Sequence, residues 1–128
     1  MSGTGKYRVF IVDDHALFLS GLKGLLGGYP ELEVVGEATD GAEFLDRIAQ
    51  TPSDVVLMDI DMPNMDGIEA TERALAENPD IRIITLSMHG DQEFYFRMVE
   101  AGAKGFILKN SDIDEVIVAI KTVADGGS

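Results

Sequence analysis

Carboxylates stand at the ends of two apolar segments of this sequence. Tyr7–Val12 (YRVFIV) stops at Asp13 and Asp14, and the run that begins at Val55 stops at Asp59. An apolar run of this kind is typical of a strand that is buried on both faces. A carboxylate at the end of such a strand is costly unless it has a partner, so we interpret Asp59 as functional rather than structural.

Two other polar side chains follow apolar segments later in the chain. Ser87 ends the segment that begins at Ile81, and Lys109 follows Gly105–Leu108. In an open parallel sheet, ligands bind beyond the carboxyl ends of the strands, near the point where the strand order reverses. We therefore expect three carboxylates to meet in one small cleft, with a hydroxyl and an ammonium group from the neighbouring strand ends.

Such a cluster of carboxylates needs a cation. Carboxylates that lie close together repel one another, and a bound divalent ion keeps them ionised. Ligation by oxygen alone suits Mg²⁺, with Mn²⁺ as the alternative. A carboxylate held beside such a metal and a lysine can attack phosphorus and form an aspartyl phosphate. Lys109 would then neutralise phosphoryl oxygens, and Ser87 would donate a hydrogen bond to one of them.

The segments that position these side chains alternate between strand and helix. The predicted strands are Tyr7–Val12, Leu32–Ala38, Val55–Asp59, Ile81–Ser87 and Gly105–Leu108. Helical spacing and cap residues predict helices over 15–26, 40–50, 66–78 and 91–102, and a last helix that Ser111 opens. In this interpretation Asp14 caps the first helix and Asp66 the third. The alternation predicts a doubly wound α/β domain with a parallel sheet, in the common strand order 2-1-3-4-5.

Length and composition favour one domain and exclude several classes of protein. A chain of 128 residues, 45% of them hydrophobic, can bury a single core, and the lack of cysteine excludes disulfides and thiolate metal sites. The net charge of −13 opposes binding to a phosphate backbone. No apolar run approaches the roughly 20 residues that span a bilayer, and the start, M-S-G-T-G, is not a signal peptide. We therefore expect a cytoplasmic protein without a membrane segment.

The whole chain resembles the receiver domain of two-component response regulators, which have the flavodoxin/CheY-like fold. The motifs that carry the resemblance are V-F-I-V-D-D-H, V-V-L-M-D-I-D-M-P-N-M-D-G-I-E-A-T, T-L-S-M and A-G-A-K-G-F-I-L-K. H-A-L-F-L-S-G-L-K-G-L-L and L-K-N-S are most similar to the NarL/FixJ (LuxR-type) subfamily, whose full-length members usually carry a C-terminal helix-turn-helix. The resemblance implies that residues 1–128 form one receiver domain, with a flexible N-terminus over 1–5 and a DNA-binding domain lost by truncation.

The resemblance also assigns roles to the acidic residues. It implies that Asp59 is the phosphoacceptor and that Asp13 and Asp14 are the acidic pair that holds Mg²⁺. Asp59 would also contact the metal, and the backbone carbonyl of Asp61 would be a further protein ligand. Asp66, in contrast, we interpret as a helix cap alone.

Three residues near the last two strands complete the implied site. Ser87 would be the switch hydroxyl, Lys109 the lysine that binds the phosphoryl group, and Phe106 the aromatic residue that turns inward with Ser87, with ordinary packing as its alternative role. Many receivers follow the lysine with a proline in a cis bond, whereas Asn110 follows Lys109 here. Because a cis bond before a residue other than proline costs about 2.5 to 4 kcal/mol, the geometry of the Lys109–Asn110 bond is open.

The function implied is a switch that catalyses its own phosphorylation and dephosphorylation, not a turnover enzyme. A histidine kinase would donate the phosphoryl group, and the change would control a partner or homodimer surface and, through the missing domain, DNA binding and transcription. The dimer face is open between the first and fifth helices and the fourth helix with the fifth strand. Two alternatives are an interaction module that is never phosphorylated and a phosphatase of the haloacid-dehalogenase type, which the D-I-D sequence also resembles.

The two histidines and three consecutive aromatic residues lie outside these roles. Neither His15 nor His89 has the sequence neighbours expected of a metal ligand, although His89, two residues after Ser87, is a hypothesis for controlling access of water to the phosphoryl group. The aromatic residues are Phe94, Tyr95 and Phe96. Because three adjacent helical side chains span about 200°, we expect Phe94 in the core and Tyr95 or Phe96 exposed as a surface that partners read.

Overall fold

Five strands and five helices alternate along the chain, as the sequence predicts. The computed structural model describes residues 6–60, 62, 65–88 and 92–127. The elements are β1 (Tyr7–Val12), α1 (Ala16–Leu26), β2 (Leu32–Ala38), α2 (Gly41–Ile48), β3 (Val55–Asp59), α3 (Gly67–Glu77), β4 (Ile83–Ser87), α4 (Gln92–Ala101), β5 (Gly105–Leu108) and α5 (Ile113–Ala124). Within these described ranges, no helix has both the length and the apolar character that crossing a membrane requires.

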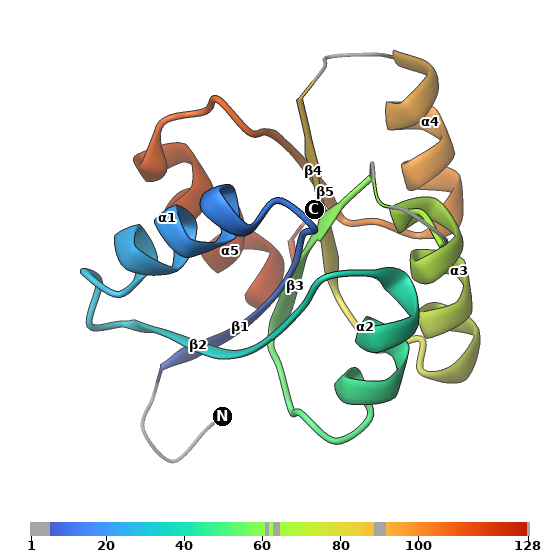
Figure 1. Cartoon of the computed structure of the whole chain (residues 1–128), viewed down its shortest axis with the longest axis horizontal. Coiled ribbons are helices and arrows are strands. Elements are labelled where there is room, and N and C mark those ends of the chain that lie inside the picture. The colour runs from blue at the N-terminus through green and yellow to red at the C-terminus, as the bar shows by residue number, and fades with distance from the viewer. Residues whose placement is uncertain (1–5, 61, 63–64, 89–91, 128) are drawn as a thin grey trace.

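The strands form one parallel sheet with helices on both faces. The strand order is β2-β1-β3-β4-β5, so the predicted doubly wound topology is confirmed. Figure 1 shows α1 and α5 on one face and α2, α3 and α4 on the other. Each face has its own core of buried apolar side chains, one of them centred on α1 and α5 and the other on α2, α3 and α4. Such cover on both faces explains why the strands are continuous apolar runs.

The central strand β3 places Asp59 at the carboxyl edge of the sheet. All five residues of β3 are buried, as are all five of β4. In the register of the sheet, Val12 of β1 pairs with Met58 of β3, and Asp59 pairs with Leu86 of β4. The residue that follows β1, Asp13, therefore emerges beside Asp59.

The opposite ends of β1 and β3 are joined by an ion pair between Arg8 and Asp54. The backbone N–H of Arg8 donates to Oδ2 of Asp54 (2.7 Å), and its Nη2 lies 3.1 Å from Oδ1. Burial opposes the charged form of Asp54, but the hydrogen bonds and charge of Arg8 outweigh it and hold the pKa of this carboxyl below its ordinary value. The pair fixes the two strands at the end of the sheet away from Asp59.

Helix α3 begins directly against the end of β3, and its first residue must be glycine. The N–H of Gly67 donates to the carbonyl of Ile60 (3.1 Å), and a Cβ at Gly67 would lie 2.2 Å from the carbonyl oxygen of Asp59. No side chain fits at that separation. Asp66 accepts the N–H of Glu69 (2.9 Å), which confirms its interpretation as the cap of this helix.

The predicted caps of α1 and α5 were wrong. His15, not Asp14, is the N-cap residue of α1, and α5 follows Asp112 rather than Ser111. Neither N-cap side chain accepts a cap hydrogen bond. Asp14 is thus not the cap residue of α1, and its side chain lies in the cluster of polar groups described below.

The buried stripe of α1 and the start of β4 also differ from the prediction. The helical spacing of Phe18, Leu22, Leu25 and Leu26 within the predicted helix 15–26 predicts these residues as its core side. In the structure Leu25 is 56% exposed, and Leu19 is buried instead. Strand β4 begins at Ile83, two residues later than predicted. On α4 the expectation is confirmed, because Phe94 packs against the core while Tyr95 and Phe96 are both exposed.

Candidate functional site

The loop after β1 and the end of β3 bring two carboxylates into the protein interior. Asp13 has no solvent exposure and Asp59 is 1% exposed. The backbone N–H of Asp13 donates to the carbonyl of Ala38 (3.0 Å), which continues the pairing of β1 with β2 beyond the strand. Burying two carboxylates is costly unless positive charge compensates for it.

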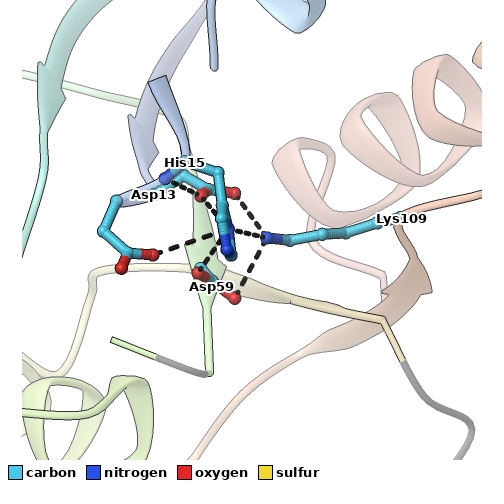
Figure 2. Close-up of polar contacts among 5 residues, drawn as sticks. Asp13, His15, Asp59 and Lys109 are labelled. Carbon is cyan, nitrogen blue, oxygen red and sulfur yellow. Dashed lines mark hydrogen bonds and ion pairs between the residues drawn. The ribbon is translucent and has the colours of Figure 1, made fainter. Parts of the chain in front are cut away.

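Lys109 supplies positive charge from the far side of the cluster. Its side chain is 3% exposed, and its Nζ lies 2.8 Å from Oδ2 of Asp13 and 3.3 Å from Oδ1 of Asp59. Figure 2 shows the lysine reaching across to the two carboxylates, which come from different strands. The ring of Phe18 lies 4.8 Å from Nζ, within the range of a cation–π contact. The structure thus brings Lys109 together with the carboxylates of Asp13 and Asp59.

Backbone pairing explains why Lys109 reaches the cluster. The N–H of Lys109 donates to the carbonyl of Ser87 (2.8 Å), so the lysine continues the pairing of β5 with β4. Ser87 itself is buried and is the last residue of β4, one residue beyond the partner of Asp59. In the part of the chain that the structure describes no peptide bond is cis, so the Lys109–Asn110 bond is trans.

His15 belongs to the cluster, contrary to the sequence interpretation. Its Nδ1 lies 3.1 Å from Oδ1 of Asp13, 3.5 Å from Oδ1 of Asp14 and 3.2 Å from Nζ of Lys109 (Figure 2). Its backbone N–H also donates to Oδ1 of Asp13 (2.8 Å). The available signal was its place directly after an acidic pair at a strand end, where the turn brings the side chain back over the cleft.

The donor atoms of the cluster fit a divalent metal ion. Asp13, Asp14, His15 and Asp59 each offer one atom, and these four atoms lie within 4.8 Å of one another. Asp13 and Asp59 are buried, whereas the side chain of Asp14 is 30% exposed. Three carboxylates against one ammonium leave an excess of negative charge, which a divalent cation would neutralise. Two residues of the sequence hypothesis, Asp61 and His89, lie outside the described residues.

Phe106 belongs to β5, and its side chain contacts α4. It packs against the core on the α2, α3 and α4 side, and its ring meets that of Tyr95 edge to face, with centroids 5.3 Å apart. In the sheet, Phe106 pairs with Thr85, and both line a pocket of about 500 Å³ together with Tyr95 and Met98. Its partner in β4, Thr85, precedes Ser87 by two residues. Phe106 is thus near the end of β4 and in contact with an exposed residue of α4, Tyr95.

Comparison with known proteins places the chain among signalling domains. Residues 9–121 match the response regulator receiver domain family. The chain is 40% identical over 123 residues to the transcriptional regulatory protein DegU of Brevibacillus brevis, which covers 96% of this chain and 52% of DegU. It is 42% identical over 128 residues to the transcriptional regulatory protein MctR of Rhizobium johnstonii, covering 100% of this chain and 60% of MctR. The chain thus spans little more than half the length of these curated relatives.

Two solved structures share this fold at similar identity. A two-component response regulator of the LuxR family from Aurantimonas sp. superposes with a TM-score of 0.91 at 34% identity, over 95% of this chain and 87% of that one. The signal receiver domain of the putative response regulator NarL from Mycobacterium tuberculosis gives a TM-score of 0.87 at 35% identity, over 94% of this chain and 98% of that one.

Proposed function

This chain is a response regulator receiver domain of the NarL/FixJ (LuxR-type) subfamily, and we propose that it accepts a phosphoryl group from a histidine kinase on Asp59. One observation carries the proposal. Asp59 is a buried carboxylate at the end of the central strand, with the ammonium group of Lys109 3.3 Å from one of its oxygens. Burial and backbone pairing fix the direction of the nucleophile, so attack requires little reorganisation of the protein.

Phosphorylation would proceed by direct displacement at phosphorus. An oxygen of Asp59 attacks the phosphorus of a phosphohistidine on the kinase, a P–O bond forms, and the P–N bond breaks. The electron pair of the broken bond leaves with the imidazole nitrogen, which takes up a proton. Hydrolysis later reverses the modification, because water attacks phosphorus, the bond to Asp59 breaks, and inorganic phosphate and the carboxylate are released.

Lys109 and Ser87 would stabilise the transferred group. Lys109 is held in place by Asp13 (2.8 Å) and can neutralise charge that develops on the phosphoryl oxygens. Ser87 lies at the same edge of the sheet and offers a hydroxyl as a hydrogen-bond donor. Both groups belong to buried strand ends, so they are oriented before the phosphoryl group arrives.

We propose Mg²⁺ as the cofactor, held by Asp13, Asp14 and Asp59, with Mn²⁺ as a substitute. The backbone carbonyl of Asp61 remains a proposed further ligand. When bound, the ion neutralises the negative charge that the carboxylates and the phosphoryl group bring together. The fold contributes to metal binding by holding the carboxylates within one cluster and by excluding water from Asp13 and Asp59.

The switch would run from Ser87 to the surface of α4. A hydrogen bond from Ser87 to the phosphoryl group draws the end of β4 toward Asp59, and Phe106 then moves into the space beside Thr85. Because Phe106 contacts Tyr95, this movement changes the exposed face of α4. Pairing of this face, or of α1 with α5, would give a phosphorylation-dependent homodimer.

We propose that the output is control of transcription by a DNA-binding domain in a longer parent protein. Relatives named as transcriptional regulatory proteins support this proposal, and the chain covers about half of their length. The net charge of −13 makes DNA binding by the receiver itself unfavourable. The modification would be stoichiometric, because each domain carries one phosphoacceptor and does not turn over a substrate pool.

The direct test is phosphorylation by a small donor. The protein is incubated with acetyl phosphate and Mg²⁺ and weighed intact, beside Asp59→Asn, the matched control Asp54→Asn at the other end of β3, and a sample with chelator. We expect one hydroxylamine-labile phosphoryl group on the wild type and on Asp54→Asn. We expect none on Asp59→Asn or without metal.

Two results would decide for the alternatives. No adduct on the wild type, with Mg²⁺ binding demonstrated and rapid quenching used, would favour an interaction module that is never phosphorylated. Continuous release of phosphate from a phosphate ester, without a stoichiometric adduct, would favour a phosphatase.

A further inference from the structure

We infer that His15 is a nitrogen ligand of the metal ion. With this ligand, the site should bind divalent ions that accept imidazole, such as Mn²⁺ and Ni²⁺, more tightly than a site with oxygen ligands alone. The inference rests on the proposed metal site, and it adds a ligand and a metal preference to it. It starts from the position of the imidazole ring in the structure.

The turn after β1 directs the ring of His15 into the cluster. The backbone N–H of His15 donates to Oδ1 of Asp13 (2.8 Å), which fixes the residue at the edge of the cleft. His15 is the N-cap residue of α1, yet its side chain makes no cap hydrogen bond. The ring is 55% exposed, but its Nδ1 faces the buried carboxylates (Figure 2). The side chain thus has no structural task in the helix and presents one nitrogen to the cluster.

The neighbours of Nδ1 make conflicting demands on it. Oδ1 of Asp13, at 3.1 Å, only accepts hydrogen bonds, whereas Nζ of Lys109, at 3.2 Å, only donates them. A single ring nitrogen can satisfy one of these partners. With its lone pair toward the cluster, Nδ1 and Oδ1 of Asp13 are two electron-pair donors in contact. The single lone pair of Nδ1 can accept from Lys109 or bind a metal ion, so a bound ion would take the place of the lysine N–H. Two adjacent electron-pair donors are the arrangement that a metal ion resolves.

The distances around Nδ1 agree with a shared ion. In an octahedral site with bonds of about 2.1 Å, neighbouring ligand atoms lie about 3.0 Å apart and opposite ones about 4.2 Å apart. Nδ1 lies 3.1 Å from an oxygen of Asp13, 3.5 Å from one of Asp14 and 3.9 Å from one of Asp59. The first separation is that of neighbouring ligands, and the other two lie between the neighbouring and opposite values, so none exceeds the largest separation that two ligands of one ion can have.

A nitrogen ligand changes which metals the site prefers. Mg²⁺ is bound by oxygen ligands, whereas affinity for imidazole rises from Mn²⁺ through Co²⁺ to Ni²⁺. His15 should therefore add little to Mg²⁺ binding and progressively more to binding of the later ions. The chain has one other histidine, His89, which provides a matched control.

The experiment reads the metal–nitrogen contact directly. Mn²⁺ is added to the untagged full chain, and electron spin echo modulation is recorded for the wild type, His15→Ala and His89→Ala. We expect ¹⁴N modulation in the wild type and in His89→Ala, where His15 is the remaining histidine, and none in His15→Ala. Calorimetry should show that His15→Ala binds Ni²⁺ about tenfold more weakly than the wild type does. The affinity for Mg²⁺ should fall by less than about twofold.

The outcomes separate this inference from the proposed function. If the wild type binds Mn²⁺, Asp14→Asn abolishes that binding and no nitrogen modulation appears, the inference fails and the proposed phosphorylation site stands. Modulation that His89→Ala removes would assign the nitrogen to His89 and also overturn the inference. No binding of Mn²⁺ or Mg²⁺ to the wild type would overturn both. Should His15→Ala fail to fold, modulation in His89→Ala alone still decides.

Discussion

Replacing Asp59 by asparagine should stabilise the protein in the absence of metal. The substitution removes one negative charge from the cluster and keeps the shape of the side chain, while one acceptor oxygen becomes an NH2 donor. Whether the substitution raises or lowers the stability of the folded protein depends on the balance of electrostatic attraction and repulsion at Asp59. The distances in the cluster allow that balance to be estimated.

Repulsion outweighs attraction at Asp59. Its Oδ1 lies 3.3 Å from Nζ of Lys109, which at an effective dielectric constant of 20 is worth about 5 kcal/mol of attraction. Oxygens of Asp13 and Asp14 lie within 4.8 Å, and each contributes about 3.5 kcal/mol of repulsion or more. The difference is about 2 kcal/mol against the charge, and the 1% exposure of Asp59 adds a desolvation cost.

Urea denaturation in chelator-treated buffer at pH 7 measures this difference. We expect Asp59→Asn to unfold with a free energy about 2 kcal/mol higher than the wild type. Adding Mg²⁺ should stabilise the wild type more than the variant, because the variant lacks one charged ligand. The difference in free energy of unfolding between the two proteins should therefore become smaller. A variant that is less stable than the wild type in metal-free buffer would refute the reasoning, since it would mean that attraction outweighs repulsion at Asp59.

Three other substitutions test the elements that position the site. Asp54→Asn should cost about 1 kcal/mol at pH 7, because it breaks the pair with Arg8. Since Asp54 has a lowered pKa in the folded protein, this cost should persist down to about pH 4 and vanish as the pH falls through that pKa; a cost independent of pH would contradict it. Gly67→Ala should cost about 2 kcal/mol or more and slow phosphorylation, because its Cβ would strike the carbonyl of Asp59; stability and rate like the wild type would rule out that contact. Asp66→Ala should lower stability by about 1 kcal/mol through loss of the α3 cap, as thermal denaturation will show, and an unchanged melting temperature would argue against the cap.

The sheet could be predicted because burial on both faces leaves a strong signal. Four of the five strands have the predicted bounds at both ends, and only β4 begins later than predicted. The signal is an apolar run that stops at a polar residue or a turn, as with Val55–Asp59. The chemistry-bearing residues were predictable for the same reason. Parallel strands end at one edge, so Asp13, Asp59 and Lys109 had to meet once the strand order was known.

The sequence could not define features that depend on side-chain direction. Helix α1 is apolar over a wide arc, so spacing alone did not decide between Leu19 and Leu25 for the core. The path of the turn after Asp13 decides that Nδ1 of His15 faces the cluster. The residue types alone did not fix the path of that turn, so the place of His15 directly after the acidic pair was not recognised as a sign that it joins the cluster.

The most direct measurement is to locate the phosphoryl group on the chain. After reaction with acetyl phosphate and Mg²⁺, borohydride reduction converts an aspartyl phosphate to homoserine, and peptide mass spectrometry then identifies the residue that has changed. We expect homoserine at position 59 alone, and none in a sample without phosphodonor. Homoserine at position 13 or 14, or at none of the aspartates while the protein carries a phosphoryl group, would contradict the assignment of Asp59 as the phosphoacceptor.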